Sequence, residues 1–350
     1  MAELQAVATT PGFVYRNGGL HFPGLGLWMD PSKPVRTGEW SVVTHAHADH
    51  TARHGAVLLT EPTRRLMRAR VPGRRIEHVL DYSRVLRSGD LGEPSARAPF
   101  TLSFHPAGHI LGSAMARVEH EGDSVLYTGD FKLRPGLSSE RCEPVAARTL
   151  VMETTYGRPR YRFPPTAAVL EDIVRFCTTT LEQGATPVLL AYSLGKTQEV
   201  LSALCDPVLP IQLHPKAAEM TRIYADLGHR FPAWTPLDPE SVRGHVVITP
   251  TLRPLLAEPG RTGPLRIASL SGWALDSRRA SDLPGGQAHR RFPLSDHADF
   301  EDLLEFVRQV NPQRVFTLHG FAADFARVLR RQGVEARALS EDDRQLDLAL

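Results

Sequence analysis

The sequence is poor in cysteine and has no long apolar run, and both shortages narrow the class of protein. Its three cysteines, Cys142, Cys177 and Cys205, are isolated and match no disulfide or zinc spacing. They fit a reducing compartment, where each is best interpreted as a small buried apolar side chain. No stretch of 18 apolar residues is present, so we expect no membrane span. The first residues lack a basic segment and an apolar core, so we expect no signal peptide and a cytoplasmic location.

A strong excess of one charge is also missing. The formal net charge is +2 and the isoelectric point is about 8.5. This mild basicity permits a polyanionic substrate without arguing for one, so any basic patch must be local. Hydrophobic residues make up 42% of the chain and charged residues 23%, which is the usual balance of a globular protein with a real core. The length of 350 residues is compatible with one large unit that carries an insertion.

The most informative stretch is the run THAHADHT at residues 44–51, which contains His45, His47, Asp49 and His50. A short β-prone stretch precedes it. Residues i and i+2 of a strand point to one face, so the first two histidines can converge, and the other two groups reach the same place from the following turn. Imidazole and carboxylate are ligands for zinc and similar divalent ions. Four such groups favour two metals over one, and over a solvated loop with chance histidines.

Other metal-capable or acidic residues are also predicted to follow strands. The strands concerned are expected over residues 40–43, 100–104, 124–127, 149–152 and 315–318. His109, Asp130, Glu153 and His319 come directly after strands or in the loops between them. Taken singly, His109 and His319 could be ordinary histidines, but each has a glycine beside it, and glycine lets backbone approach a crowded site. This pattern predicts a site at one edge of a sheet.

The pattern changes near residue 157, where strands begin to alternate with helices. Helices are predicted over residues 164–182, 195–204 and 214–227, and strands over 187–190, 246–248 and 266–268. Such alternation predicts a parallel α/β unit. Histidine motifs return after residue 292. The simplest organisation is therefore a metal domain of residues 1–156 and 290–350 that is split by an inserted domain of residues 157–289.

Six ordered motifs resemble one family. THAHADH, PAGHILGSA and YTGDF are similar to the metal motifs of the metallo-β-lactamase superfamily. METTYG around Glu153, LSDHADF around His297 and TLHGF around His319 resemble further motifs of its β-CASP nuclease branch, as does AYSLGKTQEVL in the insertion. The likeness is strongest to bacterial ligase-associated exonucleases of the DNA damage response. It implies an α/β fold, namely an αββα metallo-β-lactamase sandwich with an inserted α/β β-CASP domain.

The resemblance implies two divalent ions, with zinc as the expected metal and manganese as the alternative. The first ion would be bound by His45, His47 and His109. The second ion would be bound by Asp49, His50 and His319. Asp130 would bridge the two ions, and Asp30 would orient a ligand histidine through a hydrogen bond.

The resemblance also implies a catalytic set of His297, Glu153 and Asp49 for the hydrolysis of a phosphodiester. His297 would give a proton to the leaving 3′ oxygen, and Glu153 would hold His297 in place. The alternative is that His297 is itself a metal ligand or is satisfied by a neighbouring aspartate.

A few basic and polar residues are candidates for binding substrate phosphates. Ser193, Gly195 and Lys196 follow a predicted buried strand and open a helix, so backbone N–H groups and the lysine could hold a phosphate. The segment is not a Walker loop, because the earlier glycine of that motif is missing, and a plain helix start is the alternative. Lys132 and Arg134 follow Asp130 and could also contact phosphates, with a solvated pair as the alternative.

The sequence thus predicts a two-metal phosphodiesterase on DNA, most simply a 5′-directed exonuclease acting on single strands or ends. A functional association with a DNA ligase and a helicase is implied, and no membrane partner is expected. RNA processing is the main alternative, because RNA-cleaving relatives have a histidine at the position of His319, which the Artemis-like DNA nucleases typically lack. The long insertion argues against a small-molecule hydrolase, and the filled ligand positions argue against an inactive scaffold.

Overall fold

A computed structural model describes residues 12–35, 38–205, 208–256, 262–276 and 289–340. The chain divides into two compact units. Among the described residues, the first unit contains those up to Leu133, then Glu140–Pro159, and those from Phe300 onward. The second unit contains Arg134–Ser139 and Arg160–Asp299. The limits of the second unit differ from the predicted domain boundaries, which follow residues 156 and 289. The assignment of residues 1–156 and 290–350 to a metal domain and of residues 157–289 to an inserted domain stays a prediction.

The first sheet of the first unit begins with antiparallel strands and continues with parallel ones. Its strands are β1 (Val14–Arg16), β2 (Gly19–Phe22), β3 (Leu27–Met29), β4 (Trp40–Val42), β5 (Ala56–Leu59) and β6 (Ile76–Val79). They are arranged in sequence order, and the pairs from β3 to β6 are parallel. Strands β2 and β3 form an antiparallel hairpin, in which His21 of β2 pairs with Trp28 of β3.

The second sheet mixes the same two strand directions. Its strands are β7 (Val85–Arg87), β8 (Thr101–Pro106), β9 (Ala114–His120), β10 (Asp123–Tyr127), β11 (Thr149–Glu153), β18 (Arg314–Leu318) and β19 (Glu335–Ala338). Their order is β19-β18-β11-β10-β9-β8-β7. The strands β10, β11, β18 and β19 run parallel to one another. They therefore bring the carboxyl ends of segments far apart in the sequence to one edge.

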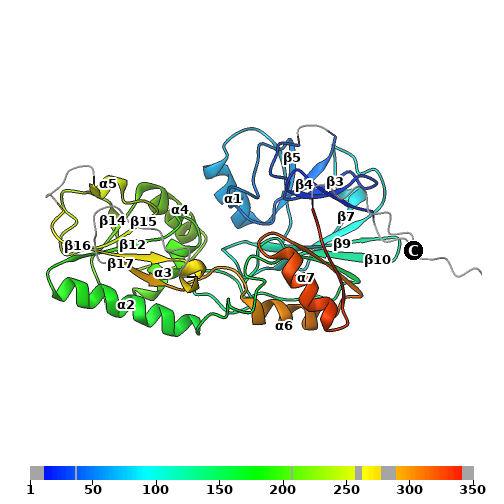
Figure 1. Cartoon of the computed structure of the whole chain (residues 1–350). Coiled ribbons are helices and arrows are strands. Elements are labelled where there is room, and N and C mark those ends of the chain that lie inside the picture. The colour runs from blue at the N-terminus through cyan, green and yellow to red at the C-terminus, as the bar shows by residue number, and fades with distance from the viewer. Residues whose placement is uncertain (1–11, 36–37, 206–207, 257–261, 277–288, 341–350) are drawn as a thin grey trace, which may run out of the picture. The chain divides into compact units, whose positions relative to one another are not determined.

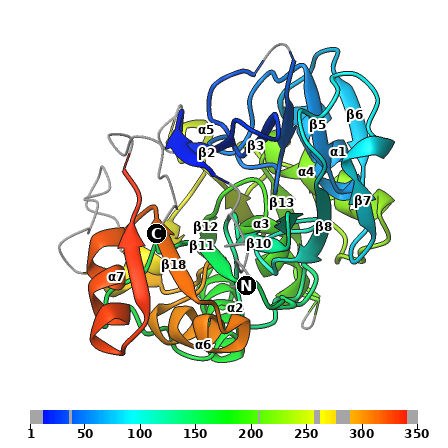
Figure 2. The ribbon, with the colours of Figure 1, turned by 90° about the vertical axis from the view of Figure 1, so that its right-hand side faces the viewer.

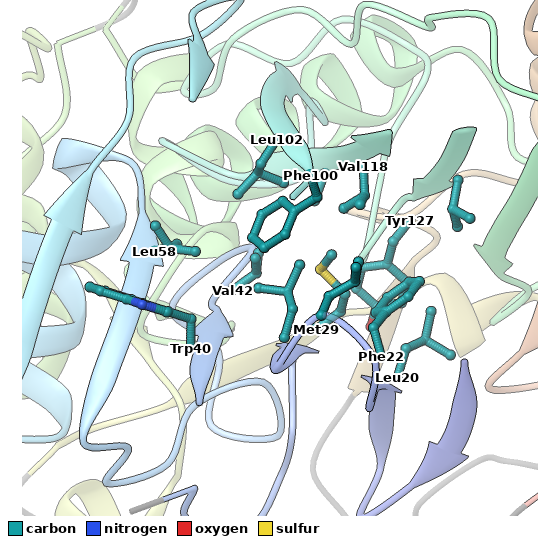
Figure 3. Packing of buried hydrophobic residues seen from close by; sticks show 14 of the residues in the cluster. Leu20, Phe22, Met29, Trp40, Val42, Leu58, Phe100, Leu102, Val118 and Tyr127 are labelled. Carbon is teal, nitrogen blue, oxygen red and sulfur yellow. The ribbon is translucent and has the colours of Figure 1, made fainter. Parts of the chain in front are cut away.

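The two sheets of the first unit pack face to face over a shared apolar core. Leu20, Phe22 and Val42 enter it from the first sheet, and Leu102 and Val118 enter it from the second (Figure 3). Burial of such side chains stabilises the unit by about 1.5–3 kcal/mol each. This core fixes the two sheets against each other and so fixes the loops at their edge.

Helices cover the outer faces of this sandwich. They are α1 (Glu61–Arg70), α6 (Phe300–Val310) and α7 (Ala322–Arg331), and a short 3₁₀ helix, η1 (Ser88–Asp90), follows β7. Helix α1 lies against β6, and α7 lies against β18 and β19 (Figures 1 and 2). The ring of Phe306 in α6 lies 4.3 Å from that of Phe131. The predicted αββα sandwich is confirmed.

The second unit is built on a parallel sheet with the order β14-β13-β15-β12-β16-β17. Its strands are β12 (Thr186–Leu190), β13 (Ile211–Leu213), β14 (Thr235–Pro236), β15 (Val246–Thr249), β16 (Leu265–Leu270) and β17 (His289–Phe292). Its helices are α2 (Thr166–Glu182), α3 (Lys196–Ala203), α4 (Pro215–Asp226), α5 (Arg253–Leu256) and the 3₁₀ helix η2 (Gly272–Leu275). The strand–helix alternation predicted for this part of the chain is confirmed.

Each face of this sheet has its own apolar cluster, as the alternation of side chains along a strand requires. Leu189 faces residues of α2, α3 and α4, whereas its neighbour Val188 faces the segment that contains Leu252 and Leu255. In the described part of the chain, no helix has both the length and the apolar character needed to cross a bilayer.

Candidate metal centre

Most of the predicted ligands lie at the carboxyl ends of strands of the first unit. His45, His47 and His50 follow β4, His109 lies between β8 and β9, and Asp130 follows β10. Because β10 and β11 are parallel neighbours, the segment after β10 lies beside Glu153 at the end of β11. The sandwich thus converts residues that are distant in the sequence into one cluster.

The nitrogen atoms of three histidines converge on one carboxylate oxygen. Asp130 Oδ2 lies 3.5 Å from His45 Nε2, 3.4 Å from His50 Nε2 and 3.8 Å from His109 Nε2. His47 Nδ1 lies 3.0 Å from His109 Nε2. One potential ligand atom from each of His45, His47, His109 and Asp130 lies within 4.8 Å of the others. This group is the set that the sequence predicts for the first ion, with the predicted bridging residue.

A hydrogen-bonded chain behind the cluster sets the orientation of two of its histidines. Asp30 Oδ2 accepts a hydrogen bond from His50 Nδ1 at 2.9 Å and another from Thr44 Oγ1 at 2.5 Å. Asp30 Oδ1 accepts from the backbone N–H of Thr44 at 2.8 Å. Because the Thr44 hydroxyl donates its hydrogen to Asp30, its oxygen accepts a hydrogen bond from His45 Nδ1 at 3.0 Å. Both histidines therefore present Nε2 to the cluster, as metal-ligating imidazoles require.

The predicted residues of the second ion are gathered less tightly. Asp49 is 80% exposed in its side chain, and its Oδ2 lies 3.8 Å from His50 Nε2. The rings of His50 and His319 are 5.9 Å apart. Within the described residues, the ligand atoms of Asp49 and His319 do not join either His-containing group of the first unit that fits within 4.8 Å. Asp49 therefore lies at the rim of the cluster, while His319 lies deeper.

Backbone conformation explains the glycines beside the histidines. His319 has φ of +56° and Gly320 also has φ of +56°. A Cβ at position 320 would lie 2.4 Å from the Cα of Thr155, which is closer than real Cβ atoms approach. A Cβ at Gly108 would lie 2.3 Å from the backbone oxygen of Lys132. At both positions glycine is required because two backbones cross closely at the site.

Burial and charge push the pKa values of these histidines in opposite directions. Burial lowers the pKa of His45 well below its usual value, and the neighbouring His50 and His109 lower it further. Burial alone would also lower the pKa of His50, but the carboxylates of Asp130 and Asp30 raise it well above the usual value. Burial lowers the pKa of His319 despite the nearby Asp130. The cluster therefore contains two imidazoles that favour the neutral form, those of His45 and His319. It also contains two carboxylates, Asp30 and Asp130, whose charge favours a cation beside them.

Two buried nitrogen atoms test whether the site fits a metal. Among the described residues, His45 Nε2 and His319 Nε2 are buried atoms without a hydrogen-bond partner. Leaving a buried polar atom without a partner costs about 1–3 kcal/mol, and a cation bound by these two nitrogen atoms would remove that cost. Imidazole nitrogen with carboxylate oxygen is the donor set of zinc and related ions. The residues present therefore fit a divalent metal.

Glu153 is buried and already oriented by backbone and hydroxyl donors. Its Oε1 accepts from the N–H of Phe131 at 3.0 Å, and its Oε2 accepts from Thr155 Oγ1. His297 belongs to the second unit, where its own N–H donates to Ser295 Oγ at 3.0 Å. Glu153 belongs to the first unit, so the pairing of Glu153 with His297 stays a prediction.

The candidate phosphate-binding residues have partners inside their own units. Gly195 donates its N–H to Gln198 Oε1 at 2.7 Å, and Lys196 Nζ donates to Asp296 Oδ1 at 3.0 Å. The backbone oxygen of Ser193 accepts a hydrogen bond from Gln198 Nε2 at 3.1 Å. Lys132 is buried, with 4% exposure, so its interpretation as part of a solvated pair does not hold. A role for these residues in phosphate binding stays a prediction.

The sequence analysis does not identify one residue of the site, Thr44. It assigns roles to Asp30 and His45 but not to this threonine, which links them by hydrogen bonds. Thr44 connects Asp30 to His45 through its hydroxyl and to Asp30 through its N–H. Its signal in the sequence is its place directly before the histidine run. That place can be seen in the sequence, but the pairing of Thr44 with Asp30, 14 positions upstream, cannot.

Comparisons with known proteins agree with this geometry. Residues 288–339 match the model of the Zn-dependent metallo-hydrolase RNA specificity domain. A probable DNA ligase of Opitutus terrae is 48% identical over 95% of this chain, and a transcription termination factor FttA of Methanosarcina mazei is 26% identical over 90%. The chain belongs to the β-CASP branch of the metallo-β-lactamase superfamily. The domain that matches residues 288–339 is named for Zn-dependent metallo-hydrolases.

These β-CASP relatives are longer than the chain. The chain spans 31% of the Opitutus terrae protein and 64% of the Methanosarcina mazei protein. A solved structure of a protein of unknown function from Enterococcus faecalis V583 has a TM-score of 0.60 over 88% of this chain and 81% of its own. Its sequence identity is 14%, so this likeness shows a shared fold and nothing more.

Proposed function

We propose that this protein is a metal-dependent phosphodiesterase that cleaves DNA, acting as an exonuclease from 5′ ends. The observation that carries the proposal is the convergence of His45, His50 and His109 on Asp130 Oδ2 within 3.4–3.8 Å. A carboxylate shared by several imidazoles suits a bridge between two ions. Two ions held a few ångströms apart form a symmetric clamp in many phosphodiester hydrolases.

The chain's own residues would hold the metals and the leaving group. One ion would be held by His45, His47 and His109. The other ion would be held by Asp49, His50 and His319, and Asp130 would contact both ions. When bound, the ions supply Lewis-acid chemistry, neutralising charge on the phosphoryl oxygens and activating water. Asp30 and Thr44 keep two imidazoles in the tautomer that such binding needs.

His297 would act as the general acid. A sugar alkoxide is a poor leaving group at neutral pH, and histidine has an unperturbed pKa close to neutrality. Glu153 would favour the protonated imidazole by its charge. Its carboxylate is held rigid by Phe131 and Thr155, which suits a positioning partner.

DNA is preferred as the substrate because of one relative. The Opitutus terrae protein, named a probable DNA ligase, shares 48% of residues with nearly the whole of this chain. This supports cooperation of the nuclease with a DNA ligase. A helicase partner and a cytoplasmic location stay predictions. Zinc is the proposed metal, supported by the name of the matching domain.

RNA is a second candidate with its own support. His319 lies within residues 288–339, which match an RNA specificity domain. Several archaeal relatives, including one of Methanothermobacter thermautotrophicus that is 33% identical over 47% of this chain, are named transcription termination factors. These facts support RNA as the second candidate, and digestion of both polymers distinguishes the two.

Digestion of end-labelled strands tests the proposal. DNA and RNA of one sequence, labelled at the 5′ or the 3′ end, would be incubated with the purified protein and zinc or manganese. We expect mononucleotides or short products from the 5′ end of DNA, and no products after chelation. Asp130→Ala should be inactive, because it removes the shared carboxylate. Products from RNA alone would overturn the DNA assignment. Undiminished cleavage by Asp130→Ala would overturn the metal-dependent mechanism.

A further inference from the structure

The segment that carries His297 is held by ionic and hydrogen-bonded contacts within the second unit. Lys196 Nζ, in the first turn of α3, donates to Asp296 Oδ1 at 3.0 Å. Their side chains are 4% and 12% exposed, so water does little to screen the pair. Asp296 directly precedes His297 in the chain. The lysine therefore acts on the residue next to the proposed acid.

Two further contacts fix the same segment on either side. Ser295 Oγ accepts from the N–H of His297 at 3.0 Å and donates to its carbonyl oxygen at 3.1 Å. Asp299 is fully buried, pairs with Arg134, and accepts from the N–H of Phe163 at 2.8 Å. The backbone of His297 is thus held locally by Ser295, and Asp296 and Asp299 fasten it to three other parts of the unit.

The first turn of α3 is itself immobilised. Gly195 donates its N–H to Gln198 Oε1, so the helix start is capped by its own side chain. Glu199 Oε2 accepts from the N–H groups of Leu137 and Ser138 at 2.8 and 3.1 Å. Lys196 therefore extends from a rigid base, and a side chain on a rigid base can fix what it binds.

We propose that Lys196 is a positioning residue for His297, acting through Asp296, and not a ligand of substrate phosphate. The inference rests on the proposed role of His297 as general acid. A buried ammonium that already contacts a carboxylate gains little from an approaching phosphate, which must displace that carboxylate. The same contact holds the backbone of the neighbouring histidine in one place, and a displacement of about 1 Å at a reacting group can cost 10²-fold in rate.

Kinetics of Lys196→Met on two substrates test this role. Methionine keeps the length and apolar stem of the side chain and removes the charge. We expect kcat on DNA to fall by about tenfold or more, up to but not beyond the roughly 10²–10⁴-fold that a general acid contributes, while KM stays unchanged. Hydrolysis of a nitrophenyl phosphodiester, whose leaving group needs no proton, should stay near that of the unchanged protein. Lys196→Arg should restore part of the rate on DNA.

A double substitution makes the assignment sharper. If Lys196 works through the acid, Lys196→Met combined with His297→Ala should be no slower on DNA than His297→Ala alone. Multiplying losses, together with a raised KM that becomes less sensitive to salt, would instead establish a phosphate contact and overturn the proposal. Equal losses on both substrates would also overturn it, since they would indicate general damage. Lys216→Met is the matched control, because Lys216 is an exposed lysine in the first turn of α4.

Hydrogen exchange separates this inference from the proposed function. Amide exchange in a peptide covering residues 294–299 should accelerate in Lys196→Met and stay unchanged in Lys216→Met. If exchange accelerates while His297→Ala remains active on DNA, the positioning contact stands and the acid assignment fails. If exchange and the rate on DNA are both unchanged in Lys196→Met, the positioning role fails, whatever His297 does.

Discussion

At the scale of single residues, the site depends on buried groups that lie behind the predicted ligands. Asp30 binds His50 and both polar groups of Thr44, and Thr44 in turn binds His45. These contacts decide which ring nitrogen carries a proton. In His45 the proton lies on Nδ1, so Nε2, which faces Asp130, keeps its lone pair. A run of histidines would be an ordinary polar loop without this support, which is why the aspartate upstream matters as much as the run itself.

His54 lies near this run and provides a pH prediction. Burial lowers its pKa from 6.5 to about 4, while its Nδ1 accepts from the N–H of Val35 at 3.2 Å. The native state keeps His54 neutral, whereas the unfolded chain binds a proton below about pH 6.5. The resulting stability is full above pH 6.5 and is lost as pH falls toward 4. It is worth on the order of 3 kcal/mol.

His54→Asn should remove this dependence, because its amide oxygen can replace Nδ1 as acceptor without titrating. Unfolding by urea would be measured with chelator present at pH 7, 6, 5 and 4.5 for both proteins. We expect the free energy of unfolding of the variant to fall less steeply than that of the unchanged protein. Parallel curves would show that His54 is as readily protonated in the native state as in the unfolded chain.

At the scale of elements, sequence patterns predict the buried strands and most helices but miss several edge strands. Strands β4, β10 and β11 are buried and lie where the sequence predicts strands, over residues 40–43, 124–127 and 149–152. Strand β6 reads Ile-Glu-His-Val and is half exposed, and β17 reads His-Arg-Arg-Phe. Both are edge strands of their sheets. Such strands need little apolar character, because charged residues there discourage pairing with other chains, so composition does not reveal them.

The metal run and the flanking motifs are predictable because their residue types and spacing are unusual. The contact of Lys196 with Asp296 is not, since 100 positions separate the two residues. In the sequence the lysine looks like part of a phosphate-binding helix start. Only the parallel sheet of the second unit, with α3 after β12 and residues 294–299 after β17, brings the two together.

The turn from β18 into α7 yields a prediction at this scale. Gly320→Ala would place a Cβ 2.4 Å from the Cα of Thr155 and would also strain a positive φ. Gly333 follows α7 with φ of +84° and nothing within 4 Å of its added Cβ, so Gly333→Ala is a matched control for the strain alone. The control should lose about 1–2 kcal/mol of unfolding free energy. Gly320→Ala should lose more, and should also lose metal because His319 moves with it.

Denaturant unfolding and elemental analysis would measure both effects. Equal losses of stability in the two variants would mean that the crossing of backbones at Gly320 relaxes at little cost. Retention of full metal content by Gly320→Ala would mean that His319 contributes little to binding.

At the scale of the whole molecule, two units with separate cores carry separate parts of the proposed site. The first unit has the core shared by its two sheets and contains the whole His45, His47, His109 and Asp130 group. The second unit has its own apolar clusters on both faces of a parallel sheet and carries His297. Units with independent cores can unfold as independent steps. Metal binding should therefore stabilise one step and not the other.

Calorimetry of the full chain tests this division. An ion present at about 1,000 times its dissociation constant stabilises the state that binds it by roughly 4 kcal/mol, which corresponds to a shift on the order of 10 °C for a unit of this size. Chelation should lower one transition by that amount and leave the other in place. Hydrogen exchange should assign the shifted transition to β4, β10 and β18. His47→Ala removes a ligand of the tight group, so its thermogram should hardly respond to metal. If chelation instead moved both transitions, or moved the one assigned to β12 and β16, the second unit would contribute a ligand. His297 would then belong among the metal-binding residues and could not be the general acid.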